Sequence, residues 1–291
     1  MKIKQDFANT IIKEVEDFNI KQILECGQCF RFKQLEENEY MIIAHNKILR
    51  IKQVDDVITL FNTTMEEFNN IWIDYFDLNT DYKRIKKILL KQDDFLYSAI
   101  SKKYGIRILR QDTWETLISF IISQNKQIPH IKKIVETISK AYGNYIGTYE
   151  GVEYYSFPTP EQLIKATEAG LRECKTGFRA PYIIDACEKI IKGDINLKEL
   201  KKISTEDAKK RLLTIKGVGN KIADCVLLYG LARGEVFPTD VWIKRVVEHI
   251  YLKKEVKLEK IQEFASSRFG DIAGYAQQYL FYYGRENRIG K

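Results

Sequence analysis

The first 65 residues or so alternate between short apolar runs and turn residues. Apolar runs of this length that are bounded by turns predict β-strands. The runs are Ile20–Leu24, Tyr40–Ala44, Ile48–Ile51 and Val57–Phe61. His45-Asn46-Lys47 separates the second and third runs and predicts a hairpin turn there.

From about residue 66 onward, apolar residues recur three and four positions apart, which predicts helices. Asp112 and Glu115 have the spacing of a capping box at the start of the first of these. The predicted helices are Trp114–Ile122, Ile128–Tyr142, Pro160–Ala166, Ala180–Ile191, Thr205–Ile215, Lys221–Leu231, Val241–Tyr251, Leu258–Phe269 and Ala273–Glu286. The fold class is therefore α+β, with a small N-terminal antiparallel sheet domain (1–100) before a large helical domain (101–291). The boundary is soft, because later helices could close onto the sheet.

The chain has 291 residues, of which 45% are hydrophobic and 30% charged, as in globular proteins. It has neither an apolar run of membrane-spanning length nor an N-terminal signal segment, so we expect a cytoplasmic protein, nucleoid-associated if bacterial. The net charge of +7 suits a polyanionic partner, although any lysine-rich proteome would give a similar charge.

Five scattered cysteines argue against a disulfide framework. Cys26 and Cys29 form one C-x-x-C pair, but no second pair accompanies it and the three histidines lie far apart. Zinc and iron–sulfur sites need four ligands in a suitable arrangement. We therefore expect neither a metal site nor a cofactor.

The most informative stretch is a helix–turn–helix pattern that contains Gly217-Val218-Gly219-Asn220-Lys221. The glycines permit tight backbone geometry, and Val218 can plug the local core. Free N–H groups at the start of the second helix can hold a phosphate oxygen. This pattern predicts a helix-hairpin-helix, which grips the DNA backbone without reading sequence. The alternative is a connection between core helices that does not bind DNA.

Lys221 has two interpretations, a contact to phosphate or an amine nucleophile. Asp240 follows it by nineteen residues, at the predicted start of another helix. Asp is also a preferred N-cap, and this role is compatible with a catalytic one. The run from about 211 to 247 resembles the helix-hairpin-helix DNA glycosylase superfamily. In that superfamily a Lys at the position of Lys221 marks enzymes that also nick the strand, and the Asp at the position of Asp240 is shared by all members.

The chemistry explains why such residues are needed. Breaking an N-glycosidic bond builds positive charge at C1′, which a nearby carboxylate stabilises. An amine can then bond to C1′ and form a Schiff base that permits elimination of the 3′ phosphate. A free lysine is mostly protonated at neutral pH, so Lys221 must lose its proton through burial, cationic neighbours or a base.

Three features resemble the 8-oxoguanine DNA glycosylase branch in particular: the N-terminal β segment, Lys221 and the absence of a C-terminal four-cysteine cluster. This resemblance covers roughly residues 15 to 285 and implies a base pocket. In it, the carbonyl of Gly27 accepts from N7–H of the oxidised base, Gln277 bonds the Watson–Crick edge, and Phe281 stacks on the base. Cys225 closes the other side, and Trp242 stands where a His is common.

The resemblance also implies how the opposite strand is held. Asn125 fills the space that the flipped base leaves, Phe178 wedges beside the orphan base, and Arg179 contacts the edge of that base. His130 stands where an Arg commonly reads the opposite cytosine, and it lacks the guanidinium fork. We therefore hypothesise weaker discrimination for cytosine, which excision rates against the four opposite bases would test.

The expected activity is excision of 8-oxoguanine from damaged double-stranded DNA by a monomer, followed by strand cleavage. Two alternatives stay open at this point. One is a glycosylase for alkylated purines, and the other is a non-catalytic DNA-binding module.

Overall fold

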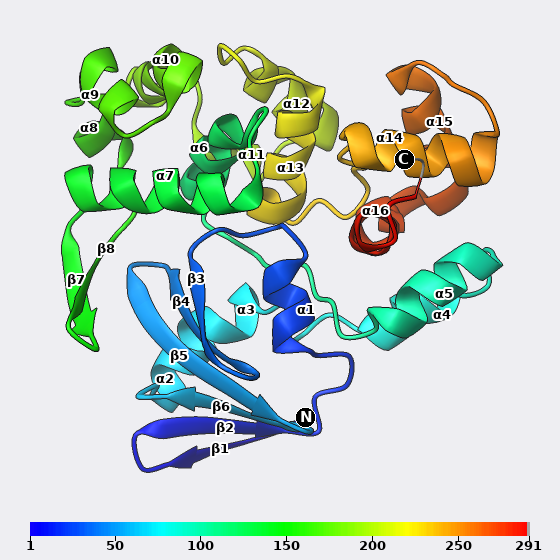
Figure 1. The fold of residues 1–291 in the computed structure, drawn as a ribbon, viewed down its shortest axis with the longest axis horizontal. Coiled ribbons are helices and arrows are strands. Elements are labelled where there is room, and N and C mark those ends of the chain that lie inside the picture. The colour runs from blue at the N-terminus through cyan, green and yellow to red at the C-terminus, as the bar shows by residue number, and fades with distance from the viewer. Residues whose placement is uncertain (290–291) are drawn as a thin grey trace.

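Six antiparallel strands form one sheet within residues 1–289, the part of the chain that the computed structural model describes. The strands are β1 (Lys2–Asp6), β2 (Asn9–Lys13), β3 (Phe32–Glu36), β4 (Glu39–Ala44), β5 (Lys47–Val54) and β6 (Val57–Phe61). Their order across the sheet is β1-β2-β6-β5-β4-β3. Figure 1 shows the sheet below a larger helical body. The predicted α+β class is confirmed.

The predicted turn at His45 and Asn46 is confirmed. Both residues have positive φ, 50° and 60°, as the tight hairpin turns that match strand twist require. The two strands that it joins pair in register from Glu39 opposite Lys52 to Ala44 opposite Lys47.

The strand predicted at Ile20–Leu24 is wrong, because this segment forms helix α1 (Ile20–Glu25). The Asn19 side chain caps the helix by accepting from the backbone N–H of Gln22 at 2.9 Å. Ile20, Ile23 and Leu24 are buried at helical spacing, and a short apolar run looks the same in a strand or in a helix.

Most of the chain after residue 65 is helical. The helices are α2 (Met65–Glu67), η1 (Phe68–Trp72), α3 (Ile73–Tyr75), α4 (Tyr82–Leu89), α5 (Asp94–Lys102), α6 (Thr113–Ser123), α7 (Ile128–Tyr142), α8 (Pro160–Leu163), α9 (Glu168–Glu173), η2 (Gly177–Arg179), α10 (Ala180–Ile191), α11 (Leu197–Leu200), α12 (Thr205–Leu213), α13 (Asn220–Leu231), α14 (Val241–Val247), η3 (Glu248–Leu252), α15 (Leu258–Phe269), η4 (Gly270–Ile272) and α16 (Ala273–Glu286). Each predicted helix is present within about three residues, except that Val241–Tyr251 divides into α14 and the π-helical turn η3.

The expectation of helices alone after residue 65 is wrong in one place, where β7 (Tyr145–Tyr149) and β8 (Val152–Tyr155) form a hairpin. Tyr154 of this hairpin packs against Met41 and Ile43 of the six-stranded sheet. Every residue of β4 is consequently buried, because one of its faces meets the hairpin and the other meets the core under α1.

Helices α6 and α13 lie against each other at the centre of the helical body. All residues of α13 from Ile222 to Leu231 are buried, as are all residues of α6 from Thr113 to Ile122 except Glu115. A helix that is buried on all sides belongs to the core rather than to the surface. The backbone at the ends of both helices is thereby held in position.

The N-terminal half and the C-terminal end of the chain also pack together. Leu96 and Ile100 of α5 share an apolar cluster with Val246 of α14 and Leu280 of α16. Figure 1 shows α5 beside α16. In residues 1–289, the helices are too short or too polar for any of them to traverse a bilayer.

The buried Gln28 side chain fastens α1 to the segment that leads into α6. Its amide donates to the carbonyls of Ile23 and Arg107 at 2.8 Å, and its oxygen accepts from the N–H of Leu109 at 2.8 Å. Buried backbone groups of this kind are costly to leave unpaired. The network holds the preceding residue, Gly27, in place.

Candidate active site and nucleic-acid interface

A cavity of about 1270 Å³ opens between the N-terminal segment and the helical body. Its walls come from Gly27, the α6–α7 loop, the first turns of α13 and α14, and α16. Seven residues predicted for the site line it: Gly27, Asn125, His130, Lys221, Asp240, Trp242 and Phe281. Segments as far apart in sequence as residues 27 and 281 therefore meet in one place.

Lys221 is the second residue of α13. Its side chain therefore starts in the first turn of this helix, and it lines the cavity. The ammonium lies 4.8 Å from the centre of the Phe120 ring and donates to Ser123 Oγ at 3.4 Å. A cation is attracted to the face of an aromatic ring. No acidic residue in the described range 1–289 forms an ion pair with this amine.

Phe120 and Ser123 did not emerge from the sequence, although both touch the predicted nucleophile. The Phe120 ring stacks on Tyr229 with centroids 5.5 Å apart and meets Phe30 edge-on at 5.6 Å. It is therefore held from two sides. Both residues lie on α6, about a hundred positions before Lys221, and no local pattern reveals such a pairing.

Asp240 caps α14 by accepting from the backbone N–H of Ile243 at 2.9 Å. The loop before it is held by Gln262, which donates to the Phe237 carbonyl and to Thr239 Oγ1, each at 2.9 Å. Because the cap and the loop are both fixed, the half-buried Asp240 carboxylate has a defined position in the cavity wall.

Cys225 lies one helical turn after Lys221 and is buried. Burial raises the pKa of its thiol to about 12, while the charge of Lys221 lowers it and those of Asp224 and Asp240 raise it. The thiol is thus protonated at neutral pH. Since both Lys221 and Asp240 act on it electrostatically, all three side chains lie in one neighbourhood.

Gly27 adopts φ +89°, a conformation that side chains disfavour. A Cβ at this position would stand 3.2 Å from the Phe281 ring and 3.3 Å from the guanidinium of Arg285. Arg285 in turn donates to the Glu25 carbonyl at 3.0 Å. Because Gly27 has no side chain, its backbone can lie close to the Phe281 ring.

Gln277 is 4% exposed, and its side-chain oxygen has no hydrogen-bond partner in the described part of the chain. It does not line the open cavity. The neighbouring Gln278, by contrast, is satisfied, because it accepts from the Tyr229 hydroxyl at 2.6 Å and donates to the Cys26 carbonyl at 3.3 Å. Gln277 thus holds a buried acceptor without a hydrogen-bond partner.

The residues predicted to face the opposite strand lie in two places. Asn125 and His130 are exposed on the α6–α7 loop and the first turn of α7, and Asn125 has a left-handed φ of 50°. Phe178 is half-exposed on η2. Arg179 is buried beneath it, stacks on its ring at 4.2 Å and donates to the Gln124 carbonyl. Arg179 therefore connects η2 to the loop that carries Asn125.

The hairpin between α12 and α13 has the expected shape. Gly217 adopts φ +76°, and a Cβ there would come within 2.2 Å of the Tyr182 ring. Val218 is 6% exposed and belongs to the main core. Gly219 is the N-cap of α13 and has open space around its Cβ position. No side chain caps this helix, so its first N–H groups are available to an anion.

Residues 1–289 contain no group of three or more His, Cys, Asp or Glu side chains that could hold a metal ion. Cys26 and Cys29 are free, buried thiols, and burial raises the pKa of Cys26 to about 11.

Comparisons with known proteins agree along the chain. Residues 10–117 match the 8-oxoguanine DNA glycosylase N-terminal domain, and residues 118–270 match the HhH-GPD superfamily of base excision DNA repair proteins. An N-glycosylase/DNA lyase of Saccharomyces cerevisiae is 30% identical, over 90% of this chain and 82% of the relative.

Two solved structures share the whole fold. The 8-oxoguanine glycosylase/lyase of Clostridium acetobutylicum, in complex with double-stranded DNA containing cytosine opposite 8-oxoguanine, is 40% identical with a TM-score of 0.96 and 99% coverage of both chains. A structure named MBOgg1, in complex with a low-affinity DNA ligand, is 48% identical with a TM-score of 0.95 and also 99% coverage of both chains.

The hairpin generates a paired prediction. Gly217→Ala must place a side chain at positive φ against Tyr182, so the free energy of unfolding should fall by about 1–3 kcal/mol. Gly219→Ala, in open space, should change it by less than about 1 kcal/mol, but it should weaken DNA binding if a phosphate binds at this turn as the sequence predicts. Chemical denaturation and duplex titration measure the two effects. Equal destabilisation by both variants would contradict this division of roles.

Proposed function

The chain belongs to the 8-oxoguanine DNA glycosylase family of helix-hairpin-helix base excision repair proteins, and we propose that it excises 8-oxoguanine from double-stranded DNA and then cleaves the strand. The observation that carries this proposal is the meeting of Lys221 and Asp240 in one cavity with Gly27 and Phe281. The first two residues supply the bond-breaking groups, and the last two supply a place for the base.

In the proposed reaction the damaged nucleotide leaves the stack and enters the cavity. The C1′–N9 bond breaks, with its electron pair going to the base, and Asp240 stabilises the positive charge that develops on the sugar. The Lys221 amine, free of its proton, forms the new bond to C1′, and its two remaining protons pass to the departing base and to the ring oxygen, so that the sugar ring opens and a Schiff base is left. Once the Schiff base is protonated, C2′ loses a proton to solvent, the electron pair forms the C2′–C3′ double bond, and the 3′ phosphate departs with the electrons of the C3′–O bond.

For the base we propose that the Gly27 carbonyl accepts from N7–H and that Phe281 stacks on the ring. The unpartnered oxygen of Gln277 suits a donor on the Watson–Crick edge of an oxidised guanine. Because this oxygen is covered, a wall residue has to move when the base enters. Phe281, four residues later and so on the same helical face, is our candidate, with Cys225 and Trp242 completing the pocket.

On the opposite strand we propose that Asn125 occupies the space of the flipped base and that Phe178 wedges beside the orphan base. The burial of Arg179 suggests that it positions Phe178 and the Asn125 loop, besides any contact of its own with the base. The hairpin Gly217-Val218-Gly219 would hold a backbone phosphate. Since one chain supplies every group, we propose a monomer, acting in the cytoplasm.

The proposed chemistry predicts opposite results of borohydride trapping for two lysine variants. Lys221→Gln should abolish borohydride trapping on an 8-oxoguanine duplex, whereas Lys126→Gln, which removes another amine of the same cavity, should keep the adduct.

Asp240→Asn should slow excision by about 10²–10³-fold with DNA binding largely kept, because Asn also caps helices well. Asp81→Asn, at the N-cap of α4, is the matched control.

Borohydride trapping and DNA binding also distinguish this function from the two alternatives, an alkylated-purine glycosylase and a non-catalytic DNA-binding module. Trapping on alkylated but not oxidised purine duplexes would favour the alkylated-purine glycosylase. DNA binding without an adduct on any lesion would favour a binding module. Normal turnover by Asp240→Asn would remove the carboxylate from the mechanism.

His130 leads to a prediction about selectivity. It is exposed on the cavity rim, without a guanidinium to bond cytosine. Excision rates opposite the four bases should therefore differ only modestly, and His130→Arg should raise the preference for cytosine by roughly 1 kcal/mol, about fivefold. Single-turnover rates measure this. Strong selectivity for cytosine opposite the lesion in the native protein would contradict this hypothesis.

A further inference from the structure

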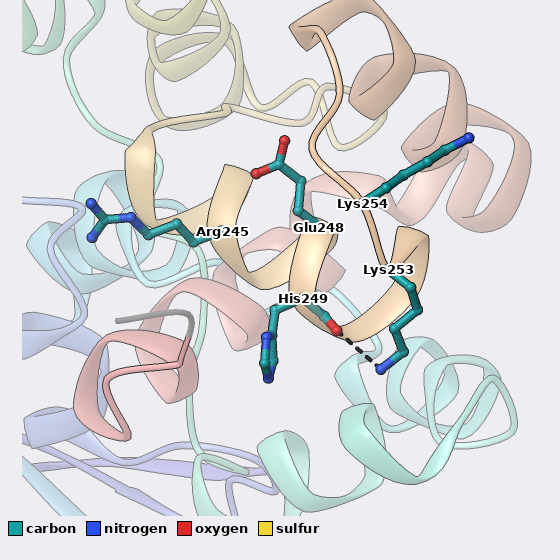
Figure 2. A pocket seen from close by; sticks show the side chains of 5 residues that line it. All are labelled: Arg245, Glu248, His249, Lys253 and Lys254. Carbon is teal, nitrogen blue, oxygen red and sulfur yellow. Dashed lines mark hydrogen bonds between the residues drawn. The ribbon is translucent and has the colours of Figure 1, made fainter.

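A second, basic pocket lies outside the active-site cavity, where α14 passes into η3. Its volume is about 420 Å³, and its lining is Arg245, Glu248, His249, Lys253 and Lys254. Figure 2 shows these side chains spread around one end of the helix, with the Lys253 amine turned toward the His249 carbonyl, to which it donates at 3.0 Å. None of them takes part in the reaction proposed above.

The one acidic residue of this pocket is already occupied. The Glu248 carboxylate accepts from Lys244 Nζ at 2.6 Å and from the backbone N–H of Val256 at 2.7 Å. By contrast, Arg245, Lys253 and Lys254 form no ion pair with any residue from 1 to 289. Three positively charged side chains therefore surround one end of this helix, and none has an ion-pair partner among residues 1–289 (Figure 2).

Helix α14 contributes residues to both this pocket and the active-site cavity. The Arg245 guanidinium lies 5.7 Å from the centre of the Trp242 ring, and Trp242 and Lys244 line the active-site cavity. The α-helical part, Val241–Val247, is about 10 Å long at 1.5 Å per residue, and the π-helical turn η3 separates its end from Lys253.

We propose that Arg245, Lys253 and Lys254, with His249 beside them, bind phosphates of the duplex that flanks the flipped nucleotide. This contact is separate from the hairpin grip. The inference rests on the proposed function only in taking DNA as the polyanion. Such contacts carry no sequence information, but they fix the register of the duplex and strengthen binding.

Salt-dependent binding of an undamaged duplex tests the proposal without requiring catalysis. For K253Q/K254Q we expect a severalfold higher Kd and a slope of log K against log salt that is shallower by about 0.9 for each phosphate that the variant no longer neutralises. Arg245→Gln alone should act in the same direction. Both lysines are exposed, and an unchanged midpoint of thermal unfolding would show that folding is intact.

The matched control is K4Q/K13Q, which removes the same charge from exposed positions on β1 and β2, at the far end of the molecule (Figure 1). Its Kd and slope should follow the native protein. If both double variants weakened binding equally, the effect would come from the net charge of the protein and not from this pocket, and the proposal would be wrong. No effect of K253Q/K254Q would also overturn it. If borohydride trapping fails on every lesion while the pocket effect stays, the catalytic proposal falls and this one stands.

Discussion

The packing of α13 against α6 is the constraint on which the site depends. Both helices are buried along almost their whole length, so neither can shift without disrupting the core. Lys221 begins its stem on one helix, while Phe120 and Ser123, which its amine touches, belong to the other. A flexible four-carbon side chain thereby acquires a defined position at the edge of a rigid pair.

The remaining parts are arranged around that pair by different physical means. The hairpin can turn into α13 because Gly217 accepts a positive φ against Tyr182. Since no side chain caps α13, its first N–H groups are open to an anion. Asp240 is fixed as a helix cap. Gly27 is fixed by the hydrogen bonds of Gln28 and by close approach to Phe281. The unsatisfied oxygen of Gln277 stands apart, since a buried acceptor without a partner costs free energy that a bound donor would recover.

Sequence patterns predicted the long helices and the central strands well, because burial repeats at fixed intervals along them. They failed at Ile20–Leu24, where five apolar-rich residues are too few to distinguish a strand from a helix and the Asn19 cap decides. They also missed the β7–β8 hairpin, which is stabilised by packing on Met41 and Ile43, a hundred residues away. Within the site, motifs led to Lys221 and Asp240, but Phe120, Ser123 and the basic pocket depend on contacts that only the fold creates.

The central claim is that the Lys221 amine forms the covalent bond to the sugar. Peptide mass mapping of the borohydride-reduced complex with an 8-oxoguanine duplex tests it most directly. We expect the sugar remnant on the peptide that contains Lys221, attached to that side chain. An adduct on Lys126, on Lys244 or on the N-terminal amine would contradict it.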